Sequence, residues 1–188
     1  MVAKTISFPK GKGHLTHNNR EFICNNVVPE RTSWNRIYIQ EPLKDAYEKC
    51  FGQALRDYNA AQKRKDRKKE DYLKEIENSG NKEKTFYENI VQIGKKTDTP
   101  VADENGVMTE EAKAAIEVLD RYAKTFQERN PNLYLFNCVM HLDVKYSIVL
   151  IVYGVYRVRE KLKIGTTYTN RKKNVYEVKW NGIGKTSK

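Results

Sequence analysis

A histidine in a polar turn near the amino terminus has the surroundings of a group that handles phosphate. His17 stands in the sequence THNNR, with Asn18 directly after it and Arg20 three residues on. An imidazole can attack or bind a phosphodiester, a guanidinium can hold the phosphate with two parallel hydrogen bonds, and side-chain amides can orient it. The same residues also fit an exposed histidine in an ordinary polar turn, and the spacing alone does not decide between these interpretations.

A second chemically capable pair, His141 and Asp143, ends a strongly apolar stretch, residues 133–143. Because side chains alternate along a strand, the two groups project from the same face. A neutral imidazole binds transition metals, and a carboxylate can be a ligand or orient one. Catalytic metal sites usually need about three protein ligands, and the whole chain has only three histidines. A strand-end histidine without a metal is therefore the alternative interpretation.

The run KRKDRKK, residues 63–69, concentrates positive charge on a predicted helix. Such a run can lie along a nucleic-acid backbone. It can equally be a solvated helical face, partly compensated by Asp66, Glu70 and Asp71. Its basic residues, which we treat as candidate DNA-binding positions, are Lys63, Arg64, Lys65, Arg67, Lys68 and Lys69.

Composition predicts a cytoplasmic protein with a polyanionic partner. The net charge is +11, but residues 144–188 hold 11 Lys and Arg against 2 Asp and Glu, so most of the excess lies in the last quarter of the chain. The mean hydropathy is −0.79, and no stretch approaches the ~20 apolar residues of a membrane span. The amino terminus has no apolar segment of signal-peptide length. The three cysteines lack CxxC spacing and are expected to be reduced thiols.

The elements that position these residues predict an α+β domain with an antiparallel sheet. Two amphipathic helices are expected, one from Pro42 through residue 77 as a single long projecting helix, the other from Thr109 to residue 129. Strands are expected at residues 3–8, 85–93, 133–143 and 147–158, with a short one ending near residue 40. We expect residues 1–158 to form the domain and the basic residues 159–188 to be a poorly ordered tail.

In combination, three stretches resemble the amino-terminal half of the Mob/Pre family of plasmid recombination and mobilisation proteins, which are relaxases of the histidine-hydrophobic-histidine class. The stretches are KTISFPKGKGHLTHNNREFI, PERTSWNRIYIQEPLKDAYEKCFGQAL and QERNPNLYLFNCVMHLD, all within residues 3–143. The family motif HNxR is matched by His17, Asn18 and Arg20, so the resemblance implies His17 as the nucleophile. A second motif is matched loosely by Asn35 and Tyr38.

The third family motif, HxDExTPHLHxD, is matched only in its first part, by His141 and Asp143. Val144 stands where the family has an acidic residue, and KYSIVLIVYG replaces the Pro-His-Leu-His segment, so two of the three metal histidines are absent. The resemblance implies transesterification of DNA assisted by Mn²⁺ or Mg²⁺, and the missing ligands imply weak metal binding and impaired nicking. The chain is then a truncated or diverged member of the family.

The partner implied by the resemblance is plasmid DNA, as a single strand or an origin hairpin, as in conjugation. Lys10 and Lys12 in the loop before His17 are further candidate DNA contacts. The alternative function is a non-catalytic nucleic-acid-binding protein that uses the basic helix and the tail. The oligomeric state is left open.

Overall fold

The computed structural model describes residues 4–9, 11, 13–80, 84–94, 99–145 and 147–156. The chain divides into two compact units. The first comprises Met1–Gln40, Tyr87–Arg129 and Leu135–Gly154, and the second comprises Glu41–Phe86, Asn130–Tyr134 and Val155–Lys188. The predicted tail, residues 159–188, and the two loop lysines Lys10 and Lys12 lie outside the described residues.

A five-stranded sheet in the order β1-β3-β5-β4-β2 forms the centre of the first unit. The pairs β1–β3, β3–β5 and β2–β4 are antiparallel, and the short connection between β4 and β5 fits the same arrangement. The predicted α+β class with an antiparallel sheet is therefore confirmed. The strands are β1 (Ile6–Ser7), β2 (Arg36–Gln40), β3 (Tyr87–Ile93), β4 (Leu133–His141) and β5 (Ile148–Tyr156).

The two most apolar strands, β4 and β5, lie in the interior of the sheet. Both are buried at most positions, because strands that are apolar on both faces are stable only where both faces are covered. β3 pairs with β5 without a break from Tyr87↔Gly154 to Ile93↔Ile148. The edge strand β1 has only two residues, shorter than the predicted strand, and a short edge limits unwanted pairing.

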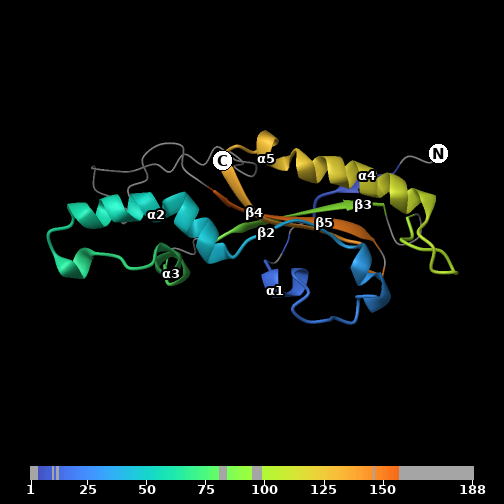
Figure 1. The fold of residues 1–188 in the computed structure, drawn as a ribbon, viewed down its shortest axis with the longest axis horizontal. Coiled ribbons are helices and arrows are strands. Elements are labelled where there is room, and N and C mark those ends of the chain that lie inside the picture. The colour runs from blue at the N-terminus through green and yellow to red at the C-terminus, as the bar shows by residue number, and fades with distance from the viewer. Residues whose placement is uncertain are drawn as a thin grey trace. The chain divides into compact units, whose positions relative to one another are not determined.

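Helix α4 (Glu110–Lys124) covers one face of this sheet (Figure 1). The Thr109 hydroxyl accepts a hydrogen bond from the backbone N–H of Ala112 at 3.1 Å, so the predicted cap is confirmed. The helix ends at Lys124 rather than continuing to residue 129, and the Thr125 hydroxyl at its end donates to the Arg121 carbonyl at 2.8 Å. A short helix, α5 (Phe126–Arg129), follows. The buried stripe of α4 is Ala112, Ala115, Ile116, Leu119 and Ala123.

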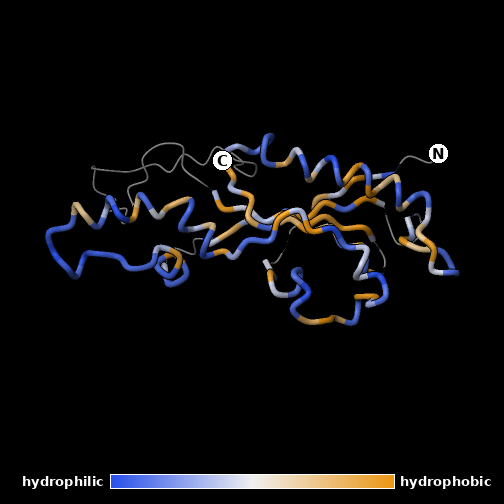
Figure 2. Tube along the Cα trace, in the orientation of Figure 1, coloured by the Kyte–Doolittle hydropathy of each residue, from blue (hydrophilic) through white to orange (hydrophobic). Residues whose placement is uncertain are grey.

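The opposite face of the sheet carries helix α1 (Leu15–Asn18) and the 3-10 helix η1 (Pro29–Trp34) (Figure 1). The loop between them exposes Phe22 and Ile23, with 49% and 67% of their surfaces accessible. Figure 2 shows the central strands as the hydrophobic centre of this unit, and this loop as an apolar segment at its margin. His17 and Asn18, which belong to α1, thus lie on this face of the sheet.

The second unit contains α2 (Leu43–Ala61), the 3-10 helix η2 (Lys65–Arg67) and α3 (Tyr72–Glu77). The prediction of one long helix through residue 77 is wrong, because α2 ends at Ala61. The Asn59 side chain joins the two arms of the turn: its amide nitrogen donates to the Lys69 carbonyl at 2.7 Å, and its oxygen accepts from the Lys69 backbone N–H at 2.9 Å.

An aromatic cluster explains why α3 folds back against α2. The Tyr72 ring lies 5.2 Å from the Phe51 ring and 6.1 Å from the Tyr47 ring, centroid to centroid. In one continuous helix, Tyr72 would stand roughly 30 Å from Phe51, at 1.5 Å per residue. The polar run after Ala61 has no apolar face to bury, so burial of the Tyr72 ring favours the folded-back arrangement.

In the described part of the chain, no helix is long and apolar enough to cross a membrane.

Candidate functional site

An ion pair between Arg20 and Asp143 is the centre of the candidate site. The guanidinium donates through Nε to Oδ2 of Asp143 at 2.8 Å and through Nη2 to Oδ1 at 2.5 Å. The Asp143 side chain is fully buried, and that of Arg20 is 12% exposed. Two parallel charge-assisted bonds at these distances are the strong form of this interaction. The pair joins the turn after α1 to the residues that follow β4, which are 123 positions apart in sequence.

Asn35 completes the surroundings of the Asp143 carboxylate. Its side-chain nitrogen donates to Oδ2 at 2.7 Å, while its oxygen accepts from the backbone N–H groups of Leu142 at 2.7 Å and Asp143 at 3.2 Å. Thr32 adds a longer contact to Oδ2, at 3.4 Å. Burial alone raises the pKa of Asp143, but the hydrogen bonds from Arg20 and Asn35 and the neighbouring His141 hold it well below its usual range. Asp143 is therefore ionised at neutral pH.

The backbone at Arg20 is also specialised. Its φ of +57° lies in the left-handed region, which costs a residue with a Cβ about 1–2 kcal/mol. The side chain helps to hold this conformation, because Nη1 donates to the His17 carbonyl at 3.0 Å. Arg20 therefore fixes the end of α1 and the Asp143 carboxylate together, and three of its donors serve the protein rather than an incoming phosphate.

His17 is half-buried on this turn, and its Nδ1 lies 3.1 Å from the sulfur of Cys24. The ring of Phe22 lies 5.8 Å away, centroid to centroid. Burial, followed by the positive charges of Arg20 and His14, lowers the pKa of His17 below its ordinary value. The imidazole is therefore neutral at pH 7, the form in which a ring nitrogen has a lone pair for attack on an electrophile.

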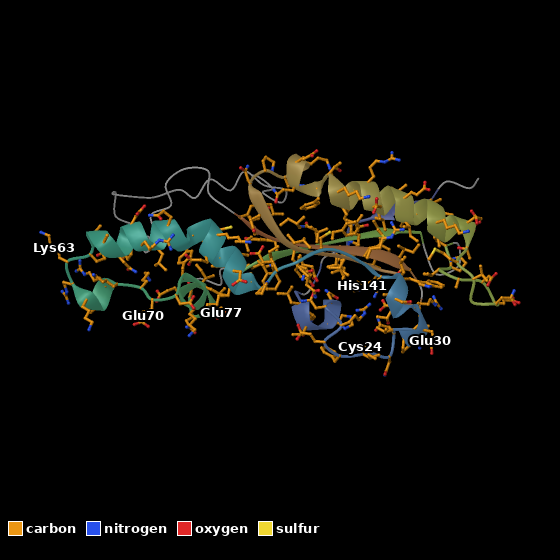
Figure 3. The ribbon with its side chains drawn as sticks, in the orientation of Figure 1. Cys24, Glu30, Lys63, Glu70, Glu77 and His141 are labelled. Atoms are coloured by element: carbon orange, nitrogen blue, oxygen red, sulfur yellow. The ribbon has the colours of Figure 1, made fainter. Side chains whose placement is uncertain are left out.

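His141 ends β4 on the same side of the sheet as α1 (Figure 3). It is 1% exposed, and neither ring nitrogen has a hydrogen-bond partner among the described residues. Its Nδ1 is 3.6 Å from Oδ1 of Asp143, longer than a hydrogen bond. Burial lowers the pKa of His141, and Asp143 opposes this only in part. His141 is thus a buried neutral imidazole beside an ionised carboxylate.

The described residues do not fit the divalent metal that the resemblance implies. No group of three His, Cys, Asp or Glu side chains is arranged to hold a metal ion in the described ranges. His141 has free ring nitrogens, but the oxygens of Asp143 already accept from Arg20 and Asn35. A metal would have to replace the guanidinium at a carboxylate where it makes two short bonds.

Asn18, the other predicted companion of His17, is directed into the protein. It is 6% exposed and its amide nitrogen donates to Oε1 of Glu88 at 2.9 Å and to the hydroxyl of Tyr153. The next residue, Asn19, accepts from Asn137 at 2.7 Å. Both asparagines thus attach the His17 turn to the sheet, and both hydrogens of the Asn18 amide are already in use.

Of the candidate DNA-binding residues that the structure describes, only Asn35 belongs to this cluster. The Tyr38 hydroxyl donates to Asp120 of α4 at 2.9 Å, and burial followed by that bond raises the pKa of Tyr38. In the second unit, Arg64 pairs with Asp66 and Lys69 with Glu75. The remaining basic residues of the run are exposed, and Figure 3 marks the first of them: Lys63, Lys65, Arg67 and Lys68.

Sequence reasoning missed Cys24 and Glu88 as members of the site. Cys24 shows only as an isolated thiol seven residues after His17. Glu88 is an acidic residue within a predicted strand, β3. A half-buried carboxylate needs hydrogen-bond donors, so its position in the strand could have indicated a polar site there. Neither residue belongs to the motifs that carry the resemblance.

No protein-family model and no curated protein matches the chain. Among solved structures, the chain is similar to the Mn-bound MobM relaxase domain (MOBV; Mob_Pre) bound to plasmid pMV158 oriT DNA. The two are 18% identical with a TM-score of 0.37, and the match covers 86% of this chain and 73% of that chain. At that identity and TM-score, the likeness does not by itself assign a function.

Proposed function

We propose that this chain is a plasmid-DNA-binding protein of the relaxase type, acting in plasmid mobilisation or recombination, with His17 as its nucleophile. One observation carries the proposal. Direct hydrogen bonds join three motif segments into one cluster: His17–Arg20, Asn35 and His141–Asp143. Each of these segments matches a different motif of the Mob/Pre family. If these sequence matches were coincidental, there would be no physical reason for the three segments to contact one another in the fold.

The His17–Cys24 contact selects the atom that attacks. When Nδ1 donates its proton to the Cys24 sulfur, the lone pair of the neutral ring lies on Nε2. Nε2 then forms the bond to phosphorus as the bond from phosphorus to the 3′ oxygen breaks. The leaving oxygen takes a proton from solvent and becomes a free 3′ hydroxyl, and the 5′ phosphate stays on the histidine.

This site is poorly equipped to neutralise the charge of the transition state, so we propose that cleavage is slow. Phosphoryl transfer depends mainly on positioning and on cations beside the equatorial oxygens. Arg20 is engaged by Asp143, and the described residues provide no set of metal ligands. The expected result is a protein that binds its origin DNA and forms the covalent link at a low rate.

Incubation with a supercoiled plasmid that carries the transfer origin tests the proposal, with Mn²⁺, Mg²⁺ or EDTA in parallel. Slow appearance of nicked circles with attached protein, lost in His17→Ala, is the expected result. His14→Ala is the matched control, since His14 is an exposed histidine on the same turn, and its side chain makes no capping bond. Nicking that persists in His17→Ala would refute the proposal.

A second function, non-catalytic nucleic-acid binding, is favoured by the exposed basic turn of the second unit. Lys63, Arg67 and Lys68 are exposed between α2 and α3. If they contact phosphates, replacing all three with glutamine lowers the slope of log affinity against log salt by about 2–3. Under this function His17→Ala leaves both binding and its salt slope unchanged, and no nicked product forms in any metal. An unaltered slope in the triple variant rejects it.

A further inference from the structure

Helix α1, which carries His17, cannot hold itself in place. It has four residues, Leu15–Asn18, and its N-cap His14 makes no side-chain capping bond. Isolated helices shorter than about 12–15 residues are marginal in water. The position of the His17 imidazole must therefore be set by contacts between this turn and the sheet.

One carboxylate on β3 binds both ends of that turn. Oε2 of Glu88 accepts from the backbone N–H of Gly13 at 2.8 Å, just before α1, and Oε1 accepts from the Asn18 side chain at 2.9 Å, at its end. The Tyr153 hydroxyl, on β5, donates to the same Oε1 at 2.6 Å. Three donors from three segments thus converge on one side chain, and His17 lies between the two ends that it holds.

Gly11, in the loop before α1, lies directly against this carboxylate. A Cβ added to Gly11 would stand 1.6 Å from Oε2 of Glu88, so any side chain there collides with it. A flexible glutamate could swing aside at little cost, but this one is held by Gly13, Asn18 and Tyr153. Glycine at position 11 is therefore a steric requirement of the network.

We propose that Glu88 is the positioning residue for His17: its carboxylate, braced by Tyr153, sets the location of the His17 ring by binding Gly13 and Asn18 together. The inference deepens the proposed function, because it assigns a reason for the ring's placement in the site. Glu88 does not contact the reacting atoms in this arrangement, and it acts mainly through the turn. Its charge also raises the pKa of His17, which burial and Arg20 lower more strongly, so Gly11→Ala, which keeps that charge, separates the two effects.

The network requires a carboxylate and not merely a polar side chain. Every partner of Glu88 in it is a donor, and a carboxylate can accept hydrogen bonds on both of its oxygens. In Glu88→Gln, the amide nitrogen faces either the Gly13 N–H or the Asn18 and Tyr153 donors. Because two donors then face each other, the hydrogen bonds at one end of the α1 turn are lost. Burial, and then the bond to Glu88, raises the pKa of Tyr153, so its hydroxyl remains a donor across the working pH range.

The test compares Glu88→Gln with the matched control Glu104→Gln, since Glu104 is exposed in the loop before α4. Imidazole NMR spectra report on the ring directly, and the three histidines of the chain can be assigned by single substitution. We expect the His17 signals to shift or broaden in Glu88→Gln and to stay unchanged in Glu104→Gln. On origin plasmid, the rate of covalent adduct formation should fall by up to about a hundredfold, the loss that a 1 Å misplacement can cause, while the DNA dissociation constant stays within about twofold.

Gly11→Ala provides a second approach, because it displaces the carboxylate while keeping every group of the network. It should produce the same change in the His17 signals. If Glu88→Gln fails to fold, Tyr153→Phe replaces it: a His17 change there supports the inference, and none overturns it. Unchanged His17 signals in folded Glu88→Gln and Gly11→Ala overturn it too. If the unmodified protein forms no adduct, the proposed function fails, and the spectra still decide whether Glu88 positions His17.

Discussion

Removing the guanidinium of Arg20 should destabilise the first unit far more than removing an ordinary surface arginine. In Arg20→Ala the Asp143 carboxylate, with a fully buried side chain, loses two short charge-assisted bonds. Breaking a buried ion pair by deleting one partner costs about 3–5 kcal/mol. Arg20 is 12% exposed and Asn35 still donates to the carboxylate, so we expect the lower end, about 3 kcal/mol. That is about a hundredfold in the folding equilibrium constant.

Urea unfolding followed by circular dichroism measures this change in the free energy of unfolding. Arg36→Ala is the matched control, because Arg36 is 49% exposed in the same unit and pairs with Asp120 at 3.3 Å. Exposed pairs contribute about 0–1 kcal/mol. Arg20→Gly gives a further check: it loses the same bonds but relieves the positive φ, so it should be about 1 kcal/mol less destabilising than Arg20→Ala. Equal losses in Arg20→Ala and Arg36→Ala would refute the reasoning.

Three other predictions follow from the same contacts. The pKa of Asp143 is depressed in the folded chain against about 3.9 when unfolded, so its stabilising effect is present above pH 4 and declines as pH falls below it. In Asp143→Asn, the melting temperature should fall less steeply as the pH is lowered below 4. A decline as steep as that of the unmodified protein counts against the ion pair. Cys24→Ala should slow adduct formation by about tenfold, the effect of one lost orienting hydrogen bond, with DNA affinity unchanged; a rate equal to that of the unmodified protein contradicts the role given to the thiol. Asn59→Ala removes both bonds to Lys69 and should cost the second unit about 1–2 kcal/mol, seen as faster hydrogen exchange in residues 65–77; unaltered exchange there argues against the bridge.

The fold followed from patterns that are local in sequence. The apolar stretches at residues 133–143 and 147–158 predicted the strands β4 and β5, and Thr109 with its apolar stripe predicted α4. The prediction of one helix through residue 77 was wrong because hydrophobic periodicity reports only on residues that are near one another in the sequence. It does not reveal that Tyr72 packs against Phe51, or that Asn59 binds Lys69.

The candidate site was predictable in part of its membership but not in its pairings. The resemblance identified His17, Arg20, Asn35, His141 and Asp143 as a set. Their residue chemistry suggested that Arg20 faces a phosphate and Asp143 a metal, whereas in the fold the two charges bind one another. Such a pairing across 123 residues depends on how the turn after α1 meets the end of β4. Glu88 and Cys24 depend on the same tertiary contacts, so no motif pointed to them.

The most direct test of the central claim, that His17 attacks DNA, is to locate the covalent link. The protein is incubated with plasmid carrying the transfer origin, digested with protease and nuclease, and the nucleotide-bearing peptide is sequenced by mass spectrometry. The proposed chemistry predicts a phosphoramidate on His17, formed slowly and at similar rates in Mn²⁺ and in EDTA, and absent from His17→Ala. A link on a different residue, or bound origin DNA with no covalent product, contradicts it.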